Sequence, residues 1–231
     1  MDFKPNLQLL SDSDPVPWHQ HNGAYAAIIL DGGYEEAGDE GRYQVTAGDV
    51  IVHPPFSAHI DRVNVKGATV VNVPLSARAA LSLSSGRVAD NEQMLWDIRS
   101  NAGDVATILT AAILPAAPKN DLPDALAAAI SRDPSMSLGL YADASGASER
   151  TLRRQFALTY GITSKHFRAR AKAKRAWEQI TYMNKALVDI ALDVGFADQA
   201  HMSRAIRWLT GYSPKQWRLA DTSKTRRVDL A

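Results

Sequence analysis

The spacing of apolar residues changes its period along the chain. Between residues 16 and 75, apolar and polar positions alternate with frequent Gly and Pro, as in YQVTAGDVIVHPPFSAHIDRV, which predicts short strands joined by turns. Residues 90–114 show helical spacing, three prolines at 114–124 indicate a linker, and every later segment is helix-like. Strands followed by helices favour separate domains. We expect an N-terminal domain at 1–89, a helical dimerisation segment and linker at 90–123, and a third domain at 124–231.

One pattern occurs twice in the helical part. The two copies are LRRQFALTYGIT at 152–163 and MSRAIRWLTGYS at 202–213. Each begins with an apolar residue. Counted from that first residue, an Arg follows at +2, a second apolar residue at +4 and a Gly at +9. Upstream, each copy has an Ala, a Gly four residues later, and then Ser148 or Asp198, which we expect to cap the next helix. A helix, a glycine turn and a capped second helix form a helix-turn-helix, whose second helix enters the DNA major groove.

The outward face of each second helix carries side chains suited to DNA. Arg and Gln form paired hydrogen bonds to guanine and adenine edges, each worth about 1–3 kcal/mol of discrimination. An αα-hairpin with solvated arginines is the alternative, which two copies in a basic domain make less favourable. A basic helix at 165–183 would hold the two reading heads about 34 Å apart, one turn of DNA. The expected DNA contacts are Arg150, Arg153, Arg154, Gln199, His201, Ser203, Arg204 and Arg207.

Charge divides the chain near the same place. Residues 1–131 hold 8 basic and 16 acidic residues, whereas residues 132–231 hold 18 and 9, within a total net charge of +1. A basic half favours a polyanionic partner. The absence of Cys excludes disulfides, thiol catalysis and thiolate metal sites. No apolar run approaches the length of a membrane span and no secretory pattern opens the chain, so a cytoplasmic protein without a membrane partner is expected.

Residues 124–218 resemble the DNA-binding domain of the AraC/XylS family of bacterial transcription regulators. The second copy, DIALDVGFADQAHMSRAIRWLTGYSPKQWR, fits closely, although Met202 and Ile206 replace the aromatic residues usual there. Both replacements keep the apolar face. The resemblance implies an α+β multidomain protein whose C-terminal all-α domain holds two helix-turn-helix motifs. It also implies double-stranded promoter DNA as a partner, with RNA polymerase as a further candidate and activation as a candidate outcome.

Four of the six histidines lie before residue 60. Two of them, His19 and His21, are two positions apart, so on a strand they share one face. The spacings resemble the two motifs of cupins, which form a small β-barrel of the jelly-roll type. Tyr25 stands where the first motif has Glu, and Phe56 where the second has Gly. The matching positions are His19, His21, Tyr25 and Gly32, then Gly48, Pro54, Phe56 and His59.

The cupin resemblance leaves two kinds of site open. His19, His21 and His59 are candidate ligands for a divalent transition metal, namely Zn²⁺, Ni²⁺, Fe²⁺ or Mn²⁺, with Tyr25 as a phenolate ligand or a cap. The alternative is a metal-free pocket for a small organic effector, walled by Trp18, Tyr25, His53 and Phe56. The acidic stretch DGGYEEAGDEGR at 31–42 predicts a solvated hairpin turn.

Two functions from different classes follow. The first is a DNA-binding transcription regulator whose cupin domain senses a small ligand or metal, with a homodimer formed through 90–114. The second is a metal-dependent cupin enzyme, of dioxygenase or isomerase type, fused to a DNA-binding module. Beyond Tyr25 and His53, no obvious general acid or base accompanies the histidines, which favours the regulator, not an enzyme. A carboxylate that orients a ligating His would discriminate between them.

Overall fold

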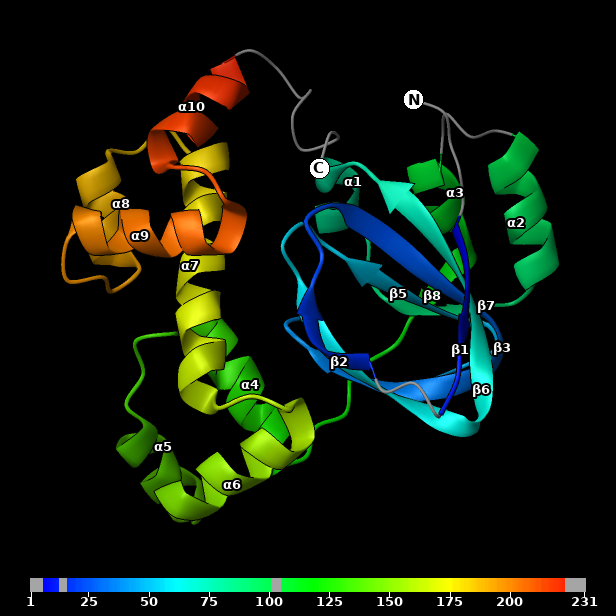
Figure 1. The fold of residues 1–231 in the computed structure, drawn as a ribbon, viewed down its shortest axis with the longest axis horizontal. Helices are drawn as coiled ribbons and strands as arrows, with labels where there is room; N and C mark the ends of the chain where they lie inside the picture. Colours follow the sequence, from blue (N-terminus) through cyan, green and yellow to red (C-terminus); the bar gives the residue numbers. More distant parts are fainter. Residues whose placement is uncertain (1–5, 13–15, 101–104, 223–231) are drawn as a thin grey trace. The chain divides into compact units, whose positions relative to one another are not determined.

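The computed structural model describes residues 6–12, 16–100 and 105–222, with the side chains of 220–222 left aside. The chain forms two compact units that divide between Lys119 and Asn120 (Figure 1). The first unit is built on one antiparallel sheet and the second is helical, as the change in apolar period predicts. Each unit is described by itself below.

The sheet of the first unit has the strand order β1-β6-β3-β5-β7-β8, with β2 beside β6 and β4 beside β3. Three helices, α1 (Ala77–Ser82), α2 (Asn91–Ser100) and α3 (Val105–Ala112), complete the unit. The strands are β1 (Asn6–Leu10), β2 (Val16–Gln20), β3 (Ala24–Gly38), β4 (Gly41–Thr46), β5 (Asp49–His53), β6 (Ala58–Leu75), β7 (Gly86–Val88) and β8 (Ile113–Pro115).

Two long strands, β3 and β6, organise this sheet. They pair from Ala24 opposite Leu75 to Gly38 opposite His59, with register shifts on either side of Gly32. Gly32 has a φ of 69°, and a Cβ there would lie 2.1 Å from the carbonyl oxygen of Gly67, so only glycine fits this bend. The alternating pattern predicts short strands. Instead, the bend at Gly32 lets β3 continue as one long strand that pairs with β6 from Ala24 to Gly38.

The central part of β3 is buried on both faces. Ala26 and Ile28 pack into one core, and Ala27 and Ile29 pack into another on the opposite face. A strand covered on both faces has no polar alternate positions, which explains the continuous apolar run in AYAAIIL.

Within residues 90–100 and 105–114, the described parts of the expected dimerisation segment, most of the large apolar residues pack inside the unit itself. Most of those of α2 and α3 are buried in the first core, and Ile113–Pro115 pairs with β7 as β8. A helix that packs on the sheet of its own chain has the same amphipathic pattern as a helix that packs on a second copy of the chain. The sequence therefore does not distinguish a core helix from a dimer interface. Trp96 is 63% exposed and lies outside that core, and a homodimer stays a prediction. The buried residues are Met94, Leu95, Ile98, Val105 and Leu109.

In the helical unit, helices surround the long helix α7 (Figure 1). Its aromatic core includes Phe156, Tyr160 and Phe167, with ring centroids 4.6–5.6 Å apart. Within the described residues, no helix combines the length and apolar character needed to cross a membrane. The helices are α4 (Leu122–Arg132), α5 (Leu138–Ser145), α6 (Glu149–Tyr160), α7 (Ser164–Tyr182), α8 (Leu187–Asp193), α9 (Gln199–Thr210) and α10 (Pro214–Thr222).

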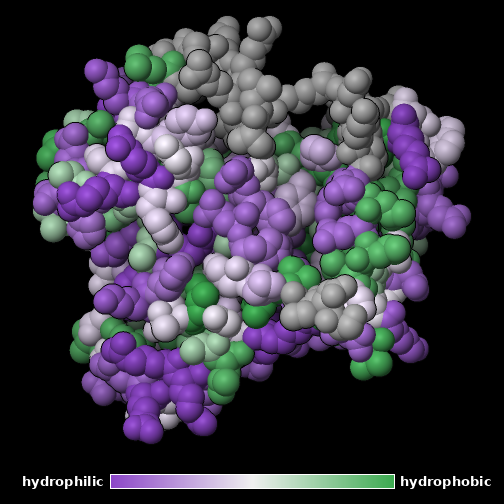
Figure 2. Space-filling view, viewed as in Figure 1, coloured by the Kyte–Doolittle hydropathy of each residue, from purple (hydrophilic) through white to green (hydrophobic). Residues whose placement is uncertain are grey.

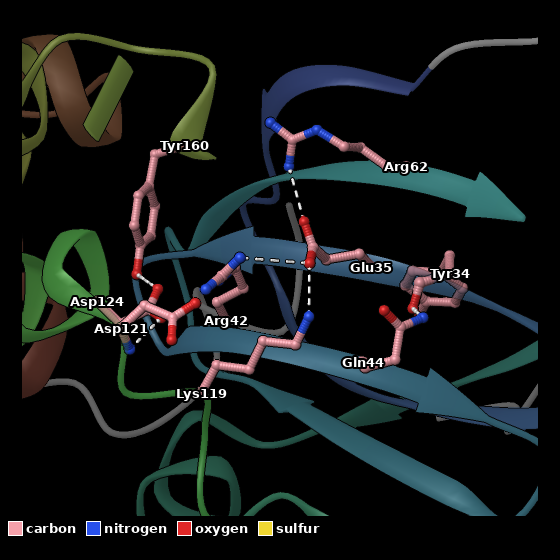
Figure 3. Close-up of polar contacts among 9 residues, drawn as sticks. All are labelled: Tyr34, Glu35, Arg42, Gln44, Arg62, Lys119, Asp121, Asp124 and Tyr160. Atoms are coloured by element: carbon pink, nitrogen blue, oxygen red, sulfur yellow. Dashed lines mark hydrogen bonds and ion pairs between the residues drawn. The ribbon is translucent and has the colours of Figure 1, made fainter. Parts of the chain in front are cut away.

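A buried hydrogen bond ties α6 to the start of α4. The Tyr160 hydroxyl donates to Asp124 Oδ1 at 3.0 Å, and the other oxygen of Asp124 accepts from the Asp121 N–H at 2.9 Å (Figure 3). One carboxylate therefore closes the helix N-terminus and anchors a core aromatic.

We predict that Tyr160→Phe destabilises the helical unit by about 1–3 kcal/mol, because it removes a donor to a buried carboxylate. The free energy of unfolding in urea measures this effect. Tyr212→Phe is the matched control, since Tyr212 is 52% exposed and should change stability by no more than about 0.5 kcal/mol. Equal losses in the two variants would contradict the prediction.

Candidate functional site

The two copies of the repeated pattern fold into the same local structure. Gly146, with a φ of 67°, ends α5, and the Ser148 hydroxyl accepts the Thr151 N–H at 3.1 Å to begin α6. Gly195, with a φ of 80°, follows α8, and the Asp198 carboxylate accepts the His201 N–H at 2.6 Å to begin α9. The left-handed glycines and short polar caps make both turns sharp. The structure thus contains two helix-turn-helix motifs.

The second helix of each motif is amphipathic in the expected sense. Leu152 and Phe156 of α6 are buried, as are Met202 and Ile206 of α9, so the two family departures keep the packing. On the face shown in Figure 2, hydrophilic residues gather over α5 and α6. Seven of the eight residues expected to contact DNA are exposed, namely Arg150, Arg153, Arg154, Gln199, His201, Arg204 and Arg207.

Two of the expected contacts have partners within their own helix. The Ser203 hydroxyl donates to the Gln199 carbonyl at 2.8 Å, and Ser203 is half-buried. Arg153 Nη2 lies 2.6 Å from Glu149 Oε2, one helical turn away. Ser203 is thus less exposed than the other predicted contacts, and Arg153 would have to leave Glu149 to contact DNA.

Part of the basic charge of α7 is structural. Lys172 donates to the Gly195 carbonyl at 2.8 Å, and Arg175 donates to the Arg132 carbonyl at 2.7 Å, so each satisfies the end of a neighbouring helix. Arg170 is buried with its guanidinium 5.9 Å from the Trp208 ring centroid. The basic pattern of α7 therefore reflects, at least in part, packing of the two motifs.

In the first unit, four strands bring the N-terminal histidines together. His19 on β2 lies opposite His59 on β6, and Tyr25 on β3 lies opposite His53 on β5. The N–H of His21 donates to the Ser57 carbonyl at 3.0 Å, which holds it beside the start of β6. The ring centroids of His19, His21 and His59 lie 4.4–5.1 Å apart. The grouping expected from the sequence is therefore present.

The cluster also contains two carboxylates that the sequence analysis did not select. Glu36 on β3 is 2% exposed and lies opposite Asp61 on β6. Glu36 Oε2 is 3.5 Å from His53 Nε2, and Glu36 Oε1 is 3.7 Å from His59 Nδ1. The hairpin DGGYEEAGDEGR is thus only partly solvated, since one of its carboxylates points inward.

Burial favours the uncharged forms of His21, His59 and Glu36. Burial, and then the proximity of His19, lowers the pKa of His21 to about 4, and burial followed by neighbouring histidines lowers the pKa of His59. Burial, and then Asp61, raises the pKa of Glu36 well above its usual value. Neutral imidazoles are the form that binds metal.

Tyr25 packs against a cluster histidine. Its ring stacks on His53 with centroids 4.4 Å apart. Burial, followed by Glu36 and Asp61, raises the pKa of the Tyr25 hydroxyl. Its role as a phenolate ligand or a cap stays a prediction.

Two groups of three residues have donor atoms within 4.8 Å of one another: His19, His21 and His59, and Glu36, His53 and His59. Imidazole and carboxylate donors at this spacing fit a divalent transition metal. His53, expected as a pocket wall, therefore belongs to the cluster.

Two pockets among the described residues of this unit are lined by other residues than the expected effector-pocket walls Trp18, Tyr25, His53 and Phe56. One, of about 370 Å³, lies beside Gly48 and Arg87, and the other, of about 330 Å³, beside Tyr43, Val52 and Pro54. The expected effector pocket stays a prediction. Phe56 is buried and has a φ of 59°, in the left-handed region that favours glycine.

Residues 141–220 match a family described as a helix-turn-helix domain. The chain is 34% identical over 94 residues to the HTH-type transcriptional activator RhaR of Klebsiella pneumoniae, covering 41% of this chain and 33% of that protein. It is 32% identical over 83 residues to an uncharacterized HTH-type transcriptional regulator of Staphylococcus aureus, covering 36% of this chain and 11% of that protein. The chain thus spans a third or less of these relatives.

Two solved structures are similar to the chain at low identity. The apo form of a single-residue variant of ToxT from Vibrio cholerae matches with a TM-score of 0.47 and 12% identity, over 95% of this chain and 97% of that chain. The C-terminal domain of AraT, a response regulator from Geobacillus stearothermophilus, matches with a TM-score of 0.41 and 20% identity, over 47% of this chain and 95% of that chain.

Close packing next to His59 generates a prediction. A Cβ at Gly38 would lie 2.5 Å from the Ala58 carbonyl oxygen and 2.6 Å from His59 Cβ. Gly38→Ala should therefore destabilise the first unit by about 1–3 kcal/mol through overpacking, measured by urea unfolding. Gly139→Ala in α5 is the control, because its Cβ would meet the flexible end of the Glu149 side chain at 3.1 Å and the Ser137 Oγ at an ordinary contact distance of 3.7 Å, and no backbone atom of the described residues outside its own helix. Helix propensity predicts a gain of about 0.5–1 kcal/mol there, and a loss at both positions would contradict the explanation.

Proposed function

We propose that this chain, whose residues 141–220 match a helix-turn-helix domain family, is a sequence-specific transcription regulator of the AraC type that binds double-stranded promoter DNA. The observation that carries the proposal is the pair of helices α6 and α9, each capped, each ended by a left-handed glycine, and each with Arg side chains exposed on its outer face. Phosphate contacts fix such helices in the groove, and contacts to base edges select the sequence.

The sheet unit is proposed as the sensor. Its histidine cluster, with His19, His21 and His59 as the candidate set from the sequence, is suited to a divalent metal. The 330 Å³ pocket, at the lower end of the usual size range for small-molecule sites, is the candidate place for an organic effector. Either ligand would change DNA affinity only by binding better to one state of the chain than to the other. Activation, contact with RNA polymerase and pairing into a homodimer belong to the same proposal.

One observation favours a second candidate, a metal-dependent enzyme joined to a DNA-binding module. Asp61 Oδ2 lies 3.7 Å from His59 Nε2, which is the carboxylate-to-histidine arrangement named as the discriminating feature. The same arrangement serves a binding site, so the regulator is preferred. Oxygen consumption or isomerisation by Fe²⁺- or Mn²⁺-loaded protein would support the enzyme.

The proposal is tested by selecting bound sequences from a random DNA library and then measuring the affinity of Arg204→Ala for the selected duplex. We expect a loss of about 1–3 kcal/mol on the selected duplex, a smaller loss on unrelated DNA, and relaxed preference at one base position. Arg207→Ala, further along α9, should weaken both duplexes alike. If selection yields no preferred sequence, sequence-specific regulation is wrong.

The ion pair on α6 generates a further prediction. Glu149→Gln releases Arg153 and removes a negative charge from the proposed DNA face, so affinity for any duplex should rise about two- to fivefold at low salt. Fluorescence anisotropy with labelled DNA measures this change. Asp189→Asn, which removes an exposed carboxylate from α8, should leave the affinity unchanged. An equal rise in both variants would indicate a general charge effect.

A further inference from the structure

We propose that the sheet unit binds one divalent transition-metal ion through Glu36, His53 and His59, and not through the three histidines that the sequence groups. The inference deepens the sensing role proposed above. Metal binding is measured without DNA, so its failure and the failure of the DNA-binding proposal are distinguishable.

The distances in this group are those of metal ligands and not of hydrogen bonds. Glu36 Oε2 lies 3.5 Å from His53 Nε2, and Glu36 Oε1 lies 3.7 Å from His59 Nδ1. Hydrogen bonds between N–H and oxygen are about 2.7–3.2 Å long. Ligand atoms around a tetrahedral Zn²⁺, each about 2.0–2.1 Å from the ion, lie about 3.4 Å apart. A small inward movement of these side chains therefore completes three ligand positions.

Burial adds a second and independent observation. Glu36 is 2% and His59 is 4% exposed, and neither Glu36 Oε2 nor His59 Nδ1 has a hydrogen-bond partner. Leaving a carboxylate oxygen and an imidazole nitrogen buried and unpaired is costly. A cation between the two atoms satisfies both of them.

The adjacent residue, Glu35, is a carboxylate whose partners are ordinary salt bridges. Glu35 points to the other face of β3. There it meets three cationic side chains, Arg42 at 3.4 Å, Arg62 at 3.3 Å and Lys119 at 2.7 Å (Figure 3). Glu36, among the residues that the structure describes, has histidines and no Lys or Arg within ion-pair distance. Lysine and arginine neutralise the outer carboxylate, whereas the inner one faces only groups that also ligate metals.

The remaining side chains fit supporting roles around this ion. Asp61 faces the far nitrogen of His59, a position from which a carboxylate orients a ligating imidazole. His21 Nε2 is buried without a hydrogen-bond partner and its ring centroid lies 5.1 Å from that of His59, so His21 is placed to supply the fourth ligand. Tyr25 stacks on His53 and fixes the plane of its ring.

His19 fits the proposed ion less well than Glu36. The ring of His19 meets that of His59 edge-on, with centroids 4.4 Å apart. His19 and His21 are only half-buried, whereas Glu36, His53 and His59 are all buried. A site with Glu36 also has an anionic ligand to offset the charge of the ion, which the three-histidine set lacks.

The test uses the full chain without a histidine tag, stripped of metal, and titrated with Co²⁺ while visible absorption is recorded. Competition with Zn²⁺ then gives the Zn²⁺ affinity. We expect one ion per chain in the wild type. Glu36→Gln and His53→Ala should each weaken binding at least tenfold and change the Co²⁺ spectrum. His19→Ala should change the affinity by less than threefold.

Glu35→Gln is the matched control, because it removes a carboxylate from the same strand on the opposite face. Circular dichroism of each variant checks the fold, and the isosteric Glu36→Gln keeps the test valid if His53→Ala does not fold. Loss of binding in His19→Ala with unchanged binding in Glu36→Gln would overturn the proposal in favour of the three-histidine set. A wild-type chain that binds no Co²⁺ or Zn²⁺ at micromolar concentration would overturn it as well.

Discussion

The antiparallel pairing of β3 with β6 is the constraint on which the sheet unit depends. Its register places Glu36 opposite Asp61 and Gly38 opposite His59, while β2 adds His19 along the other edge of β6. A slip of one residue would turn every one of these side chains to the opposite face. Backbone hydrogen bonds, and not attraction between the side chains, therefore gather a carboxylate and several imidazoles whose burial would otherwise oppose folding.

A different device serves the helical unit. The long helix α7 lies between the two motifs, and its basic side chains satisfy the carbonyl ends of shorter helices through Lys172 and Arg175. The excess of basic residues, which by composition alone favours a nucleic-acid partner, thus also includes side chains that hold helices together within the unit. The exposed arginines of α6 and α9 are the ones proposed to contact DNA, and the first turns of these helices are held by local caps.

How far the sequence predicts the structure depends on how local each signal is. The two motifs were predictable because Ser148, Asp198 and the turn glycines act within a few residues of their own position. The spacing in residues 90–114 predicts an apolar helix face, but it does not predict that the face packs on the sheet of the same unit. Glu36 was missed because it lies in an acidic, glycine-rich stretch typical of a solvated turn, and only the pairing with a strand more than twenty residues later shows that it is buried.

If α6 and α9 bind DNA as proposed, their equal lengths limit the number of base pairs that one copy of the chain contacts. Each has 12 residues, which at about 1.5 Å per residue makes a rod of roughly 18 Å. With base pairs about 3.4 Å apart, such a rod spans at most about five of them. Two such rods would distinguish one site among about 10⁶ sequences, whereas genomes offer about 10⁶–10⁹ competing sites. On the proposed function, a single copy would therefore carry barely enough information to select one site in a small genome, and repetition of the target along the DNA would supply the remainder.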